Sequence, residues 1–370
     1  MEKEKKIKVG ITHGDINGIG YEVILKSLED NRILELCTPI IYGSAKIAAF
    51  YRKAADMPAV PLNQIASAAE ARDGANNIIN VVGEDVKIEP GQSTEDAGQA
   101  AFIALERAVT DLRCGEIDVL VTAPINKHNI QSSTFTFPGH TEYLEASIGD
   151  GAKALMILCN DIMRVALVTT HCPLSQVADK ITVDAIVEKL EIFNRSLTRD
   201  FGIPTPRIAV LSLNPHAGDS GLLGKEENEI IIPAIGKARE QKILCFGPYA
   251  SDGFFGSGNF KKFDGILAMY HDQGLTPFKT LAMESGVNFT AGLPFVRTSP
   301  DHGTGYDIAS KGEAGEESMR HAIYTAIDIL RNRCRYDEIT RRPLRRKYFD
   351  KSGDKEVLDL TKDPDADKDL

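Results

Sequence analysis

The sequence predicts an α/β protein with a mixed, mostly parallel sheet and helices on both faces. Two observations support this fold class. Short apolar runs rich in Val, Ile and Leu alternate with amphipathic stretches along the chain, a pattern typical of parallel strands joined by helices. The chain has 370 residues, which exceeds the size at which one core usually keeps growing, so two domains flanking a cleft are expected.

Seven apolar runs are predicted to be buried strands, and four amphipathic stretches are predicted to be helices. The strands are expected at residues 7–12, 38–42, 118–122, 154–158, 164–169, 207–213 and 265–269. The helices are expected at residues 96–112, 183–198, 225–241 and 316–331. A short connection with Asn160 and Asp161 separates the fourth and fifth strands, which predicts a hairpin and therefore a mixed sheet.

No internal repeat or low-complexity linker divides the chain, which favours a discontinuous arrangement of domains. We expect residues 1–130 plus 300–345 to form the first α/β domain. Residues 131–299 should form the second, which would carry the metal and the dimer contacts. Residues 352–370 have too few apolar side chains to bury and are predicted to form a flexible charged tail.

The overall composition limits the partners of the protein. A formal charge of -10 opposes attraction to nucleic acid or to anionic membranes, and no apolar stretch is long enough for a membrane span. The six cysteines are scattered and no secretory segment precedes them, which indicates a reduced compartment. The expected protein is cytoplasmic and acts on a small molecule.

Three histidines follow predicted strands, and this is the sharpest signal for chemistry. His171 follows RVALVTT, His216 follows RIAVLSLNP, and His271 follows GILAMY. If the carboxyl ends of these strands share one edge of a sheet, three neutral imidazoles converge and can bind a divalent metal ion with one open position. General bases, phosphate donors and hydrogen-bonded structural histidines are the alternatives.

Two glycine-bearing loops also follow strands. Residues 214–221 (NPHAGDSG) form a polar loop whose backbone could approach an anion closely. Residues 13–20 (HGDINGIG) precede a probable helix, but their spacing is GxxxGxG and does not match the dinucleotide or phosphate-loop patterns. The simpler interpretation of this second loop is a turn that places Asp15 near the active site.

A third segment carries groups that can hold an anion. Lys279, Asn288 and Arg297 supply an ammonium, an amide and a guanidinium that could together bind a phosphate or carboxylate. The alternative is a set of solvated surface residues. The polar loop at residues 299–307 is of the kind that binds nucleotides, which favours a functional interpretation.

With these segments in place, the chain closely resembles the 4-hydroxythreonine-4-phosphate dehydrogenases of pyridoxal phosphate biosynthesis, over nearly its full length. The motifs that carry the resemblance are GDINGIGYE from Gly14, APINK from Ala123, PGHTEYL from Pro138, TTHCPL from Thr169, NPHAGDSG from Asn214, GPYASD from Gly247, YHDQG from Tyr270 and NFTAGLPFVRTSPDHGTGYDIA from Asn288. Several motifs in the same order make a chance match negligible.

The resemblance implies an isocitrate- or isopropylmalate-dehydrogenase-like fold and a homodimer with a shared active site. It implies one divalent ion (Zn, Mg or Co) on His171, His216 and His271, with one ligand contributed across the dimer, and a catalytic role for these histidines and Asp252. His140, Thr141, Lys279, Asn288 and Arg297 would bind substrate. Cofactor contacts to NAD or NADP are expected from Asn214, Gly218, Asp301, His302 and Asp307.

The implied reaction is NAD-dependent oxidation of 4-phosphooxy-L-threonine at C3, with decarboxylation to 3-amino-2-oxopropyl phosphate in vitamin B6 synthesis. The alternatives are a paralogue acting on 4-phospho-D-threonate or 4-phospho-D-erythronate, and a non-catalytic metabolite-binding protein. Residues 125–137, which include Lys127, are expected to form a variable lid.

Overall fold

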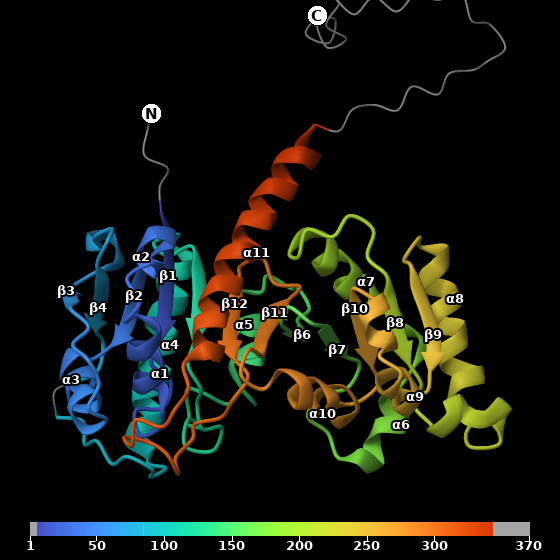
Figure 1. Ribbon diagram of the computed structural model, residues 1–370, viewed down its shortest axis with the longest axis horizontal. Coiled ribbons are helices and arrows are strands. Elements are labelled where there is room, and N and C mark those ends of the chain that lie inside the picture. The colour runs from blue at the N-terminus through green and yellow to red at the C-terminus, as the bar shows by residue number, and fades with distance from the viewer. Residues whose placement is uncertain (1–5, 84, 343–370) are drawn as a thin grey trace, which may run out of the picture.

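The computed structural model describes residues 6–83 and 85–342, so the predicted tail at residues 352–370 lies outside the described residues. At its centre is a 12-stranded sheet in the order β3-β4-β2-β1-β5-β12-β11-β6-β7-β10-β8-β9 (Figure 1). The strands are β1 (Ile7–Thr12), β2 (Cys37–Gly43), β3 (Leu62–Ile65), β4 (Asn76–Asn80), β5 (Val119–Thr122), β6 (Leu155–Cys159), β7 (Arg164–Leu167), β8 (Ile208–Leu211), β9 (Cys245–Tyr249), β10 (Gly265–Ala268), β11 (Val287–Ala291) and β12 (Arg297–Pro300).

The sheet contains two parallel blocks whose strands run in opposite directions. β3, β4, β2, β1, β5 and β12 form one block, and β7, β10, β8 and β9 form the other. Between them, β11 pairs antiparallel with β12 and β6, and β6 pairs antiparallel with β7. The prediction of a mixed, mostly parallel sheet is confirmed.

The predicted hairpin joins β6 and β7, with Ile157 opposite Ala166. Its turn is stabilised by the Asn160 side chain, whose Oδ1 accepts hydrogen bonds from the backbone N–H groups of Ile162 (2.9 Å) and Met163 (3.0 Å). Asparagine is favoured in such turns because its short polar side chain can replace a backbone partner.

The predicted helices all form, and two of them have different bounds. The helices are α1 (Gly20–Ser27), α2 (Ile33–Leu36), α3 (Ala45–Ala54), α4 (Glu95–Arg113), α5 (His140–Ile148), α6 (Val177–Lys180), α7 (Val183–Arg199), α8 (Ile232–Glu240), α9 (Ser251–Gly256), α10 (His271–Ala282) and α11 (Glu317–Arg341). Thr94 and Thr182 cap α4 and α7 by accepting a hydrogen bond from a first-turn N–H. A π-helical turn precedes α8, and α11 extends ten residues past Arg331 because no glycine or proline interrupts it.

The two faces of the sheet are packed differently. On one face, a continuous hydrophobic core runs from Val9 through Phe289 to Met269 and includes residues of α1, α7, α8 and α11. On the other face, one cluster gathers around α4 and α5, and a separate one around α9 and α10. The centre of the sheet is therefore left without a hydrophobic cover on that face. Within the described residues, no helix is long and apolar enough to cross a membrane.

Candidate active site

A pocket of about 460 Å³ lies over the centre of the sheet, between the two separate hydrophobic clusters. Its floor comes from alternate residues of neighbouring strands, since alternate side chains of a strand point to the same face. Ser299, Asn288 and Leu158 stand opposite one another in register on β12, β11 and β6. The beginnings of α5 and α10 form two of its walls. The pocket therefore lies where the direction of the sheet reverses.

At one end of the pocket, Arg297 is held as a buried cation. It is 3% exposed and donates hydrogen bonds to the hydroxyl oxygens of Thr122 (2.6 Å) and Thr290 (3.2 Å). Burial lowers the pKa of Arg297 to about 10, so the guanidinium stays charged at neutral pH. A buried guanidinium whose hydrogen-bond partners are neutral attracts anions strongly. This end of the pocket is therefore suited to bind an anion, although the net charge of the whole protein is negative.

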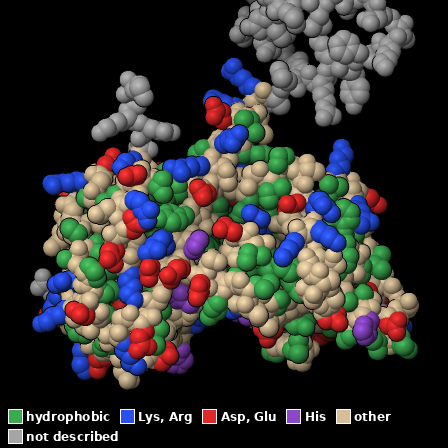
Figure 2. All heavy atoms as spheres, in the orientation of Figure 1, with side chains coloured by type: hydrophobic (Ala, Val, Ile, Leu, Met, Phe, Trp, Pro, Cys, Tyr) green, Lys and Arg blue, Asp and Glu red, His purple; other side chains and the backbone are tan. Residues whose placement is uncertain are grey.

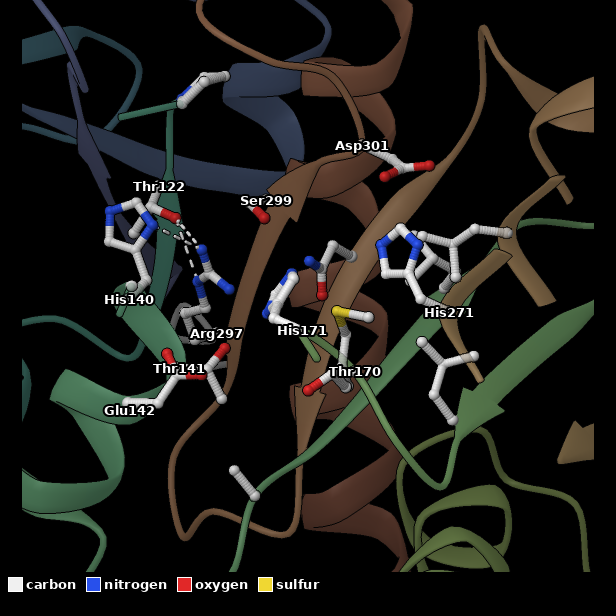
Figure 3. A pocket seen from close by; sticks show the side chains of 18 of the residues that line it. Thr122, His140, Thr141, Glu142, Thr170, His171, His271, Arg297, Ser299 and Asp301 are labelled. Carbon is white, nitrogen blue, oxygen red and sulfur yellow. Dashed lines mark hydrogen bonds between the residues drawn. The ribbon is translucent and has the colours of Figure 1, made fainter. Parts of the chain in front are cut away.

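His140, the first residue of α5, lies beside this guanidinium (Figure 3). Its Nδ1 is 3.1 Å from Arg297 Nη2, and because Arg can only donate, Nδ1 accepts. Burial and the Arg297 charge lower the pKa of His140 well below its usual range, so the ring is neutral and carries its proton on Nε2. This Nε2 is buried and has no hydrogen-bond partner among the described residues, which leaves it free for a ligand.

Two more buried polar atoms of pocket residues have no partner in the described part of the chain. They are Asn288 Oδ1 on the floor and His302 Nε2 on the rim. Buried polar atoms are rarely left unpaired, since each such atom costs about 1 to 3 kcal/mol. Three in one pocket indicate a polar ligand.

At the other end of the pocket, His171 and His271 lie together (Figure 3). Their ring centroids are 5.7 Å apart, and they follow the adjacent strands β7 and β10, as the strand-end prediction requires. His271 Nδ1 is 2.7 Å from Asp272 Oδ1, and His171 Nε2 is 3.4 Å from Lys127 Nζ. Burial lowers the pKa of His171, and the charges of Lys127 and His271 lower it further, which keeps the imidazole neutral. Neutral imidazoles are the form that binds metal ions.

His216 does not join them. It is exposed and lies five residues beyond β8, in a stretch where residues 216–220 all have positive φ. No group of three or more His, Cys, Asp or Glu residues that could hold a metal ion occurs within residues 6–83 and 85–342. Within one copy of the chain, two of the three predicted metal-binding histidines therefore lie together and the third does not.

The loop that carries His216 is organised around a buried carboxylate. Glu227 is 1% exposed and accepts hydrogen bonds from the backbone N–H groups of Leu213 and Asn214, each at 2.8 Å. Gly218 is confined by the same side chain, because a Cβ there would stand 2.5 Å from Glu227 Oε2. The backbone N–H groups of Leu213 and Asn214 are therefore already used by Glu227 and are not available to an external anion.

The remaining predicted residues divide into two groups. Thr141, Lys279, Asp301 and His302 line the pocket, and Lys279 Nζ lies 3.4 Å from Asp301 Oδ1. Asn214 and Gly218 belong to the His216 loop, while Asp252 on α9 and Asp307 are exposed and do not line the pocket. The predicted cofactor residues are therefore not all in one place within a single chain.

Several polar residues that line the pocket were not among the predicted site residues. Ser299 lies two positions after Arg297 on β12, and Glu142 lies in the first turn of α5. Lys127 lies in the segment that was expected to form a lid. For Ser299 and Glu142, strand and helix spacing relative to Arg297 and His140 was the available signal.

The first glycine loop does not reach the pocket. Residues 13–20 are all buried, and Asp15 Oδ2 accepts hydrogen bonds from Tyr306 Oη (2.7 Å) and Asn129 Nδ2 (2.8 Å). A Cβ on Gly18 would stand 2.6 Å from the carbonyl oxygen of Thr304. Gly18 therefore allows the backbone of Thr304 to pack closely against this loop. Asp15 links the loop to Tyr306 and Asn129, which belong to segments with residues in the pocket, but Asp15 itself does not line the pocket.

Comparison with known proteins agrees with these motifs. The family model for the pyridoxal phosphate biosynthetic protein PdxA matches residues 35–326. A 4-hydroxythreonine-4-phosphate dehydrogenase from Bacteroides thetaiotaomicron is 60% identical, covering 97% of this chain and 98% of the relative. A putative D-threonate 4-phosphate dehydrogenase from Oceanobacillus iheyensis is 38% identical, covering 88% of this chain and 98% of the relative.

A solved structure supports the same assignment. The 4-hydroxythreonine-4-phosphate dehydrogenase from Klebsiella pneumoniae superposes with a TM-score of 0.77 at 35% identity, covering 89% of this chain and 99% of that one. Fold, motif order and sequence similarity thus all agree, and this chain belongs to the PdxA family.

Proposed function

We propose that this protein oxidises 4-phosphooxy-L-threonine at C3 with NAD and releases its carboxylate as CO₂, giving 3-amino-2-oxopropyl phosphate for pyridoxal 5′-phosphate synthesis. The observation that carries the proposal is the pocket itself, where a buried arginine with a free imidazole N–H stands at one end and two adjacent histidines stand at the other. A phosphate ester of a small hydroxy acid presents matching groups to both ends.

The residues of the chain have separable tasks in this reaction. Arg297 and His140 would hold the phosphate, because together they offer a fixed positive charge and an unpaired N–H. Thr141 and the N–H groups at the start of α5, which no side chain caps, would add donors on the same side. The predicted Lys279 and Asn288 would orient the rest of the substrate. This binding places C3 toward His171 and His271.

His171 and His271 would hold a divalent ion, such as Zn, Mg or Co, and the 5.7 Å separation of their ring centroids fits that role. When bound, the ion would polarise the C3 oxygen, and the nicotinamide would accept the hydride. NADP remains an alternative to NAD. We place the enzyme in the cytoplasm, as its scattered cysteines favour.

We further propose a homodimer in which His216 of a second copy completes the metal site. Its exposure supports this, as do the nearby Leu222 and Leu223, which are 79% and 44% exposed. Exposed apolar side chains beside a potential metal ligand are suited to burial against another chain. The predicted cofactor residues Asn214 and Gly218 belong to the same loop.

A second candidate is oxidation of 4-phospho-D-threonate or 4-phospho-D-erythronate, in which a hydroxyl replaces the amine. The relative from Oceanobacillus iheyensis keeps this candidate open, but the relative from Bacteroides thetaiotaomicron is considerably more similar. NADH formation should be measured with the amino acid and with both hydroxy acids. A higher kcat/KM for 4-phosphooxy-L-threonine supports the proposal, and equal or better rates on a hydroxy acid would refute it.

The phosphate assignment has its own test. Replacing Arg297 with Ala should cost about 2 to 4 kcal/mol of transition-state stabilisation, as loss of one partner from a buried charged contact commonly does. Arg297→Lys keeps the charge but loses the fork of donors, so KM should rise. The wild type should strongly prefer the phosphate ester over the unphosphorylated substrate. If Arg297→Ala retained that preference, Arg297 would not be a phosphate ligand.

A further inference from the structure

Four cationic side chains line the pocket, and three of them already contact oxygen atoms of the protein. Arg297 donates to Thr122 and Thr290. Lys279 pairs with Asp301. Lys189 Nζ lies 3.5 Å from the carbonyl oxygen of Ala154 and 3.8 Å from Glu188 Oε1.

Lys127 is different. The structure gives its ammonium a contact with the neutral ring of His171 at 3.4 Å and no oxygen partner within the described part of the chain. Lysine can only donate, so His171 Nε2 accepts in this contact. An ammonium with one neutral acceptor keeps most of its charge available for an anion.

Lys127 lies near residues from both ends of the pocket. The residue follows β5 and precedes α5, and its Cε lies 3.8 Å from the point where a Cβ on Gly139 would stand. Gly139 immediately precedes His140, and the Lys127 Nζ lies 3.4 Å from His171 Nε2. The ammonium therefore lies within electrostatic reach of both the Arg297 end and the histidine end.

The proposed substrate has two anionic groups, and the roles assigned above provide for only one of them. The phosphate is matched to Arg297 and His140, and the hydroxyl is matched to the two histidines. Lys279, which would help to orient the rest of the substrate, is already paired with Asp301, so the carboxylate that leaves as CO₂ has no unpaired cation assigned to it. We propose that Lys127 is a substrate-binding residue whose ammonium pairs with this carboxylate.

This inference rests on the proposed function, and it changes the interpretation of residues 125–137. The alternative is that Lys127 is a solvated lysine on a variable lid, since its side chain is exposed. An exposed lysine usually contributes little, but here the substrate would cover it and exclude water from the pair. The two interpretations differ in whether the effect of the lysine depends on the substrate carboxylate.

The test compares two ligands that differ in that group alone. One is 4-phosphooxy-L-threonine without NAD, so that no turnover occurs. The other is 3-amino-2-hydroxypropyl phosphate, which keeps the amine, the hydroxyl and the phosphate. Dissociation constants are measured by calorimetry on the full-length protein for the wild type, Lys127→Met and the control Lys189→Met, whose lysine already has oxygen partners.

Lys127→Met should weaken binding of the carboxylate ligand by roughly tenfold or more, as expected for loss of a charge-assisted contact. Its affinity for the ligand without the carboxylate should stay within about twofold of wild type. Lys127→Arg should restore part of the loss, and Lys189→Met should bind both ligands like the wild type.

Equal weakening for both ligands, or no weakening for either, would overturn the proposal. Thermal unfolding of each variant verifies that the fold is intact, and a folded Lys127→Met protein makes either result decisive. Failure of the proposed function is distinguishable, because the wild type would then not reduce NAD with 4-phosphooxy-L-threonine. A wild type that turns over the substrate while Lys127→Met binds both ligands normally would overturn only the role of Lys127.

Discussion

The glycine loops at residues 13–20 and 214–221 have opposite surroundings. Every residue of the first loop is buried, and Gly14 and Gly18 stand against backbone atoms of neighbouring segments. In the second loop, Pro215, His216, Asp219 and Ser220 are exposed. Both loops follow a strand and both are rich in glycine, so local pattern alone does not separate a loop that supports the fold from one that is proposed to carry chemistry.

The difference lies in what each loop packs against. The first loop is joined through Asp15 to Tyr306 and Asn129, both inside the same chain. The second packs on its own chain through Glu227 and leaves His216 outward, where a second copy could meet it. Figure 2 shows acidic and basic side chains interspersed over the molecular face it displays, so no single charge dominates there. Loss of stability is expected from changes in the first loop, and loss of activity from changes in the second.

The largest expected effect comes from His216. Replacing it with Ala should abolish activity and its dependence on a divalent ion, and should leave the melting temperature nearly unchanged because the side chain is exposed. Chelation of the wild type should have the same effect on activity, reversed by adding the ion back. Full turnover by the chelated enzyme or by the variant would refute the metal assignment.

Mixing variants tests whether His216 acts across a dimer. Hybrids of His216→Ala with His271→Ala should contain one complete site in each mixed dimer, so a random mixture should recover roughly a quarter of wild-type activity. Hybrids of His171→Ala with His271→Ala are the control, since both residues lie in one pocket and no complete site can form. Recovery in neither mixture, or a fully active monomer in sedimentation, would contradict the shared site.

The next effect is on stability and comes from Gly14. Its φ is +71°, and an added Cβ would stand 2.3 Å from the carbonyl oxygen of Pro124. Gly14→Ala should therefore lower the free energy of unfolding by about 2 to 4 kcal/mol, measured by urea denaturation. The matched control is Gly74→Ala, with a φ of +75° but no atom within 4 Å, where the cost should be about 1 kcal/mol. Equal losses of unfolding free energy in the two variants would show that the close packing around Gly14 does not contribute to stability.

The same contrast explains how much of the fold was predictable. Strands with continuous apolar runs, such as β1 and β10, were found because both of their faces are buried. Five strands were not predicted, namely β3, β4, β9, β11 and β12. The last two, β11 and β12, lie under the pocket. Asn288, Arg297 and Ser299 interrupt their apolar pattern because these side chains line the pocket. The polar side chains that line the pocket are therefore the reason that β11 and β12 could not be recognised from an apolar pattern.

The site was predictable to a different degree. Strand ends predicted that His171, His216 and His271 would converge, and within one chain the first and last of these lie together while His216 does not. The contact of His140 with Arg297 joins residues 157 positions apart, so only the family resemblance could pair them as binding groups. The outward position of His216 depends on the left-handed turn at residues 216–220, which no periodicity reveals.

The smallest expected effect is a pH dependence of stability that originates in the first loop. His13 is fully buried, and its ring stacks on Tyr21 with centroids 5.3 Å apart. Burial lowers the pKa of His13 from 6.5 to about 4. The folded protein therefore holds this ring neutral, whereas the unfolded chain takes up a proton below pH 6.5. The resulting stability is present above pH 6.5 and is lost as the pH falls toward 4.

His13→Phe keeps a stacked ring but removes the titration. Between pH 7 and pH 4.5, the wild type should lose about 1 to 3 kcal/mol more unfolding free energy than this variant, since other buried histidines such as His140 contribute equally to both proteins. A Tyr21→Leu variant controls for the stack, because it should lower stability by a similar amount at both pH values. Parallel pH profiles of the unfolding free energy for wild type and His13→Phe would contradict this prediction. They would show that the folded protein accommodates a protonated His13 without a loss of stability.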